Sequence, residues 1–67
     1  MSEAFIGKRI DELLVVKKLS AEEVSKELGQ SKEYIDKIIA NEIALSMNMF
    51  LAICDLLKIS PAEFFTE

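Results

Sequence analysis

Residues 20–38 read SAEEVSKELGQSKEYIDKI, a stretch that predicts two helices joined by a sharp turn. The first helix should begin at Ala21, because Ser20 and Glu23 have the spacing of a capping box. In that arrangement the serine side chain and the glutamate side chain each accept a hydrogen bond from the other residue's backbone N–H. The helix should end at Gly29, since glycine adopts the left-handed conformation that ends a helix at low steric cost.

The second helix of the pair should follow almost at once. Only Gln30 separates Gly29 from Ser31, which is a favoured N-cap residue, so we expect a helix from Lys32 to about Ala40. The side chains expected to face inward from the two helices are Val24, Leu28, Ile35 and Ile38. Together with the small residue Ser25, this pattern indicates a helix-turn-helix.

Three further helices are predicted, one before this pair and two after it. One should span about Ala4 to Lys17, with apolar residues at a helical spacing that begins at Ile6. Asn41 should end the helix that begins at Lys32, and Ser46 should cap a fourth helix. Ser60, Pro61 and Glu63 combine an N-cap, a proline at the first helical position and a second capping box, which predicts a short fifth helix carrying Phe64 and Phe65. The apolar side of the fourth helix should consist of Met47, Phe50, Ile53, Cys54 and Leu57. We therefore expect one all-α domain of five short helices over residues 1–67.

Composition narrows the possible functions. The chain has 67 residues, 51% of them apolar, with a net charge of −4, no histidine and one cysteine. Cys54 should be a small buried hydrophobic residue, and no nucleophile–base pair or zinc site can be assembled without histidine or a second cysteine. We predict a protein that is not an enzyme and holds no metal or cofactor. With no signal peptide and no membrane-spanning segment in the sequence, we also expect a cytoplasmic location.

The chain from Ile6 to Phe65 resembles the phage-repressor and Cro-like family of helix-turn-helix domains, often called the XRE type. The similarity lies in residues 6–10, 19–29, 31–38, 50–57 and 59–65. It implies a lambda-repressor-like domain that binds double-stranded DNA as a sequence-specific transcriptional regulator. Its recognition helix, at about 32–40, would lie in the major groove.

The resemblance also implies roles for particular residues. Those facing the groove would be Ser31, Lys32, Glu33 and Asp36, and those approaching phosphates would be Arg9, Ala21, Lys37, Glu42 and Ile43. Tyr34 can stack or approach a phosphate, but it can equally be partly packed beside Ile35. Lys32 and Lys37 also have a simpler explanation as solvated helix surface. Glu33 and Asp36 have one too, because the partial positive charge of a helix N-terminus favours acids.

The chain departs from the family pattern in ways that favour a second hypothesis. Ala21 stands where the family often has glutamine, and residues 41–45 replace a commonly basic loop. Between Ser20 and Ser46 there are six acids and three lysines, which gives a net charge of −3. Proteins usually bind DNA through clustered lysine and arginine. The alternative is therefore a helix-turn-helix scaffold that has lost DNA binding and acts as a protein-interaction module through Ile39, Ile43 and their neighbours.

The chain also has more apolar residues than a five-helix core needs. The surplus consists of Val15, Val16, Ile39, Ile43, Leu45, Met49, Leu56 and one of Phe64 or Phe65. Contiguous apolar surface on a small domain usually marks a partner site. We expect a homodimer with its interface near the fourth and fifth helices.

Overall fold

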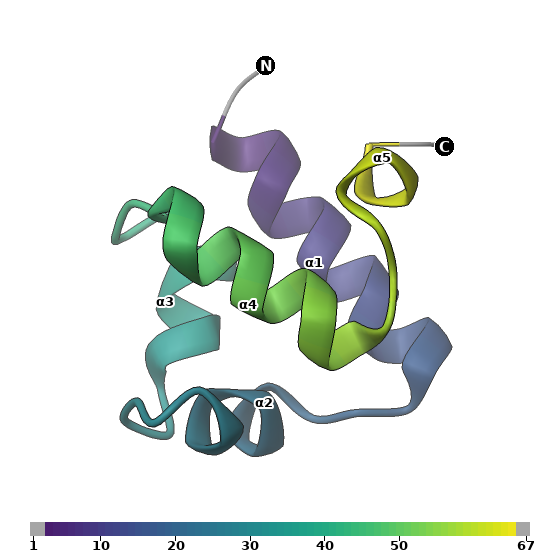
Figure 1. Cartoon of the computed structure of the whole chain (residues 1–67). Helices are drawn as coiled ribbons and strands as arrows, with labels where there is room; N and C mark the ends of the chain where they lie inside the picture. The colour runs from purple at the N-terminus through teal and green to yellow at the C-terminus, as the bar shows by residue number, and fades with distance from the viewer. Residues whose placement is uncertain (1–2, 66–67) are drawn as a thin grey trace.

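The computed structural model describes residues 3–65, and all the regular structure in them is helical (Figure 1). The elements are α1 (Glu3–Lys17), α2 (Ala21–Glu27), α3 (Tyr34–Ile39), α4 (Met47–Leu57) and α5 (Pro61–Phe64). The predicted all-α fold of five helices is confirmed. Of the predicted domain, residues 1–2 and 66–67 lie outside the described residues. No helix in the described range is long and apolar enough to cross a membrane.

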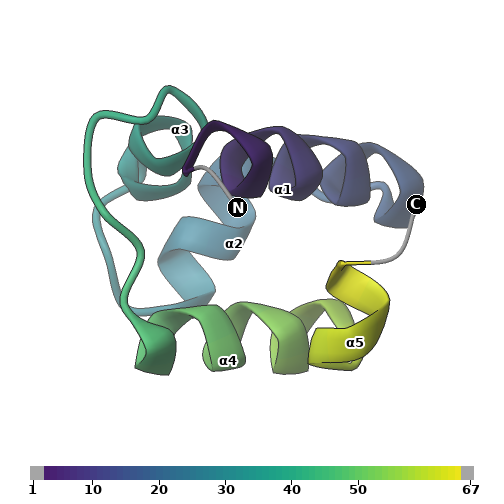
Figure 2. The same cartoon turned by 90° about the horizontal axis from the view of Figure 1, so that it is seen from above.

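The helices surround one apolar core. Viewed from above, α1 and α4 lie on opposite sides of the molecule, with α2 and α3 toward one end and α5 toward the other (Figure 2). The buried apolar residues are Ile10, Leu13, Leu14, Val24, Ile35, Ile38, Phe50, Ile53, Cys54, Leu57 and Phe64. Every helix contributes at least one of them, so the core fixes the α2–α3 pair against the other helices.

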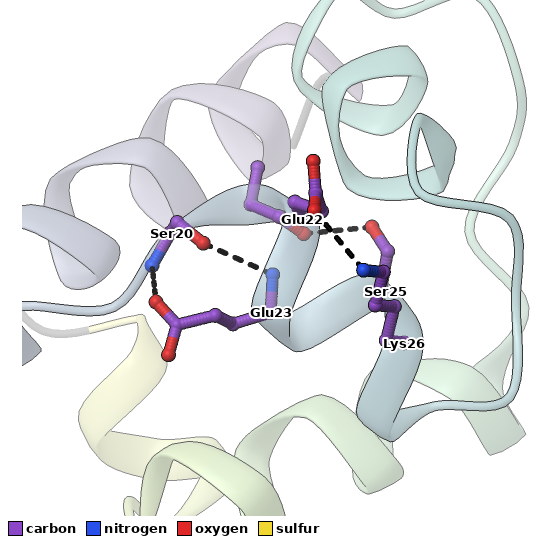
Figure 3. Close-up of polar contacts among 6 residues, drawn as sticks. Ser20, Glu22, Glu23, Ser25 and Lys26 are labelled. Carbon is purple, nitrogen blue, oxygen red and sulfur yellow. Dashed lines mark hydrogen bonds and ion pairs between the residues drawn. The ribbon is translucent and has the colours of Figure 1, made fainter.

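Three of the four predicted N-cap residues are confirmed. The Ser20 Oγ atom accepts the Glu23 N–H at 3.0 Å and the Glu23 carboxylate accepts the Ser20 N–H at 3.1 Å, as Figure 3 shows. Ser60 and Glu63 form the second capping box, and Ser46 caps α4. These bonds satisfy N–H groups that have no partner within a helix.

The predicted N-cap at Ser31 is wrong, because α3 begins at Tyr34 and its N-cap is Glu33. Ser31 contributes its backbone carbonyl, which accepts the Tyr34 N–H at 3.0 Å in a turn that precedes the helix. The cap comes instead from Ser25 on α2, whose hydroxyl oxygen accepts the Ile35 N–H at 3.0 Å. A contact between residues ten positions apart leaves no local signature in the sequence.

The helix ends match the sequence only in part. Gly29 (φ 74°) and Asn41 (φ 63°) have the predicted left-handed conformation. Lys18 (φ 59°) and Lys58 (φ 58°) adopt it as well, although their residue type does not indicate it. After Lys18, the Leu19 N–H bonds the Leu14 carbonyl at 3.0 Å and the leucine side chain packs on the core. The same occurs after Lys58, so tertiary packing imposes the lysine conformation.

Met47 also differs from its predicted place in the core, since 67% of its surface is exposed. It is the first residue of α4 and lies outside the run of buried residues that begins at Phe50. The other four predicted core residues of α4 are buried, as expected.

Gly7 allows α1 to approach α3 closely. A Cβ atom at this position would lie 2.8 Å from the Ile39 carbonyl oxygen and 3.0 Å from the Ile39 Cα. Real Cβ atoms do not come this close to backbone atoms, so only glycine fits without a shift of the helices. Gly7 thereby allows α1 to pack against the C-terminal end of α3.

Candidate nucleic-acid interface

A single hydroxyl group joins the two helices of the motif. Ser25 is fully buried; its Oγ atom donates to the Ala21 carbonyl at 2.7 Å and accepts the Ile35 N–H at 3.0 Å. The first of these bonds is visible in Figure 3. Because one atom serves both helices, α3 is held at a fixed position on α2.

The exposed side of α3 brings together five of the predicted site residues. Ile35 and Ile38 point into the core, which leaves the opposite side of the helix and the preceding turn at the surface. The exposed residues there are Ser31, Lys32, Glu33, Asp36 and Lys37. They present hydroxyl, ammonium and carboxylate groups on one surface, which we call the α3 face. Neither lysine of the α3 face forms an ion pair with a described residue.

Two further predicted residues lie beside the α3 face with their side chains packed. Tyr34 is partly buried against the core, which favours the packed interpretation of this side chain. Ala21, the first residue of α2, is also partly buried, and its carbonyl is taken by Ser25. Near it, Glu22 and Lys26 form an exposed ion pair at 3.1 Å, so one of the three lysines of the motif has an acidic partner.

The segment after α3 is exposed, acidic and apolar. Glu42, Ile43 and Ala44 are all at the surface, and 37% of Ile43 is exposed. Beneath them lies a hollow of about 60 Å³. It is lined by Ile6, Ile38, Asn41, Ile43, Ala44 and Leu45. The segment supplies no cation that would meet a phosphate.

Arg9 does not join the α3 face. Its Nε atom donates to the Phe64 carbonyl at 2.7 Å, and its Nη2 atom donates to the Glu63 carbonyl at 3.1 Å. The guanidinium therefore binds the C-terminal end of α5, where carbonyl groups lack helical partners. Both views place α3 and α5 at different ends of the molecule (Figures 1 and 2).

The structure offers no arrangement for catalysis around its cysteine. Cys54 is buried in the core, and this burial raises the pKa of its thiol above the ordinary value. A neutral buried thiol is a poor nucleophile. Among residues 3–65, no three His, Cys, Asp or Glu residues are grouped as ligands of a metal.

Comparison with known proteins gives one match. A family model described as helix-turn-helix, HTH_3, matches residues 10–64, which include α2, the turn and α3. Searches of the curated proteins and of the solved structures gave no match.

Proposed function

The chain belongs to the helix-turn-helix family HTH_3, of the XRE and Cro type, and from this membership we propose that it is a sequence-specific DNA-binding transcriptional regulator. The family match carries the proposal, because it covers the whole motif. The α3 face supports it, since the predicted groove residues are exposed together rather than scattered. Binding, with no catalytic step, accounts for the chemistry at this surface, and we place the protein in the cytoplasm.

In the proposed complex, α3 lies in the major groove of duplex DNA. Ser31, Lys32, Glu33 and Asp36 face base edges, where a carboxylate can accept a hydrogen bond from the N4 amino group of cytosine. Lys37 faces a phosphate, and Ala21 and Tyr34 lie close to the backbone without a charged contact. With few cations available, we expect weak non-specific binding that is visible only at low salt.

We also propose that the regulator is a homodimer. Three exposed apolar residues support an interface there: Met47 (67% exposed) and Leu51 (46%) on α4, and Phe65 (40%), the C-cap residue of α5. We call these the α4–α5 surface. Two copies joined there would present two α3 faces to half-sites about one helical turn apart.

The test is fluorescence anisotropy of a labelled pool of random duplex DNA at low salt, repeated as salt is added. Non-specific binding reports phosphate contacts without knowledge of the operator. We expect binding that weakens as salt rises, after which a specific site can be selected from the pool. No change in anisotropy at low salt, even at high micromolar protein, would refute the proposal.

A second candidate, a protein-interaction module without DNA binding, is favoured by one specific observation. The motif has a net charge of −3, and the segment after α3 exposes Ile43 rather than cations. In this case Ile43→Lys would abolish association with a partner protein, whereas Lys37→Ala would have no effect. Unchanged light-scattering mass and unchanged binding partners in Ile43→Lys would remove the basis for this candidate.

A further inference from the structure

The last turn of α1 carries the two most exposed large apolar residues in the part of the chain that the structure describes. Val15 is 74% exposed and Val16 is 71% exposed, and the exposed residues Lys17 and Lys18 follow them directly. In Figure 1 this end of α1 projects beyond α4 at the lower right. We call residues 15–18 the valine–lysine turn. Neither the core nor the α3 face uses these side chains.

A groove of about 490 Å³ lies next to this turn, between α2 and α4. Its lining consists of Leu19, Glu23, Val24, Lys26, Glu27 and Leu56. The leucines are only partly buried, so they offer apolar surface inside the groove, and the glutamates add negative charge at its edge. The ammonium of Lys26 pairs with Glu22 at 3.1 Å, and neither Glu23 nor Glu27 forms an ion pair with a described residue.

The α2–α4 groove is therefore complementary to the valine–lysine turn in both apolar character and charge. We propose that the occupant of the groove is the valine–lysine turn of a second copy of this chain. Val15 and Val16 of one copy cover Leu19 and Leu56 of the other, and Lys17 and Lys18 pair with Glu23 and Glu27. The turn and the groove adjoin through Leu19, so a two-fold axis makes both contacts at once, as an isologous interface requires.

The contact is separate from the α3 face. Along α2, residues 25 and 27 lie about 200° apart around the helix, and Ser25 holds α3. The groove thus opens on a different side from the helix that is proposed to meet DNA, and the inference does not depend on DNA binding. The surface is small, so the association is weak and is visible only at high protein concentration.

Charge reversal tests the inference sharply. To separate the groove from the α4–α5 surface, every protein in the test carries Leu51→Lys. In sedimentation equilibrium from about 10 µM to about 1 mM protein, we expect the chain with this substitution alone to self-associate. Lys17→Glu and Glu27→Lys, each added singly, should weaken association about tenfold or more, because like charges then face each other. A mixture of the two variants should recover it, because in the mixed pair each Glu faces a Lys at both contacts. Glu42→Lys, the same charge change away from the groove, is the matched control and should behave as Leu51→Lys alone.

The outcome is also distinguishable from a dimer that forms through the α4–α5 surface. Val16→Lys should abolish groove contacts, and since Val16 is exposed the variant should keep its circular dichroism spectrum and melting temperature. Leu51→Lys should leave these contacts intact. The inference is overturned by a Leu51→Lys chain that stays monomeric over the whole range, by charge variants that associate as Leu51→Lys alone does, or by a mixture that does not recover association.

Discussion

Ser25 fixes the geometry of the motif through one buried oxygen atom. The sequence marks position 25 only as small, because neither partner of the hydroxyl can be recognised from local spacing. The structure shows that the hydroxyl replaces the missing N-cap of α3, whose own N-cap residue, Glu33, makes no side-chain bond. A buried N–H without an acceptor lowers the free energy of unfolding, so the contribution of this bond can be measured.

Ser25→Ala should lower the free energy of unfolding by about 1 to 3 kcal/mol, because it leaves the buried Ile35 N–H without an acceptor. The matched control is Ser31→Ala, which should change the free energy by no more than about 0.5 kcal/mol, since the side chain of Ser31 caps nothing. Urea denaturation measures both. Equal effects of the two substitutions would show that Ser31 acts as a cap in solution.

Substitution by alanine should lower the free energy of unfolding by different amounts at the two glycines. Gly7→Ala should destabilise the fold by about 1 to 3 kcal/mol, because the new methyl group meets the backbone of Ile39 at 2.8 Å. At Gly29 a Cβ meets nothing within 4 Å, so Gly29→Ala should cost only the left-handed backbone penalty of about 1 kcal/mol. The two denaturation curves compare them directly, and a smaller effect at Gly7 would contradict the close approach of α1 and α3.

Cys54 predicts how stability depends on alkaline pH. Burial raises the pKa of its thiol, so the unfolded chain loses this proton at a lower pH than the folded chain. The buried thiol therefore makes its full contribution to the free energy of unfolding below the pKa of the unfolded thiol, about 8.5. This contribution is lost as the pH rises through the folded pKa. Urea denaturation between about pH 7 and pH 10 should show a steeper fall for the wild type than for Cys54→Ala. Parallel curves would contradict the burial of the thiol.

At the level of helices, α5 depends on an arginine from the other end of the chain. It has four residues, and both bonds from Arg9 go to carbonyl groups at its C-terminal end. A helix this short is unstable by itself, so contacts with α1 and α4 must supply its stability. The resemblance implied a phosphate contact for Arg9, and the sequence could not show that a carbonyl 55 positions away lies within reach.

Arg9→Met should therefore destabilise the fold by about 2 kcal/mol through the loss of two charge-assisted hydrogen bonds. It should leave the salt dependence of DNA binding unchanged when measured below the unfolding temperature. Denaturation and anisotropy titrations on the same sample separate the two effects. A variant with normal stability and a reduced salt slope would instead place Arg9 on a phosphate.

Lys37 on α3 and Lys32 in the turn before it carry the cationic part of the proposed interface. Lys32→Ala and Lys37→Ala should each weaken DNA binding, and Lys37→Ala should reduce the slope of log K against log salt by about 0.9, the value for one phosphate contact. Lys58→Gln, at the far end of α4, removes the same charge away from α3 and should change neither quantity. Identical slopes in all three variants would exclude the predicted phosphate contact.

For the whole molecule, the sequence predicted the number of helices, most of their starts and almost all of the core. These features rest on local signals such as the two capping boxes, Pro61 and the apolar spacing. The features it missed rest on contacts between distant residues: Ser25 with Ile35, Gly7 with Ile39 and Arg9 with α5. The α3 face was predictable as a set because exposed polar residues on a helix follow from its buried side.

Two properties of the whole molecule act in opposite directions on DNA binding. The net charge of −4 opposes any approach to a duplex, and the family fold favours it. The most direct test is a titration of ¹⁵N-labelled protein with random duplex DNA at low salt, followed by the shifts of the backbone amide signals. We predict the largest shifts at residues 31–37 and at the start of α2, with little change in α5. Unchanged spectra with DNA in excess, or shifts confined to α4 and α5, would contradict the proposed role of α3.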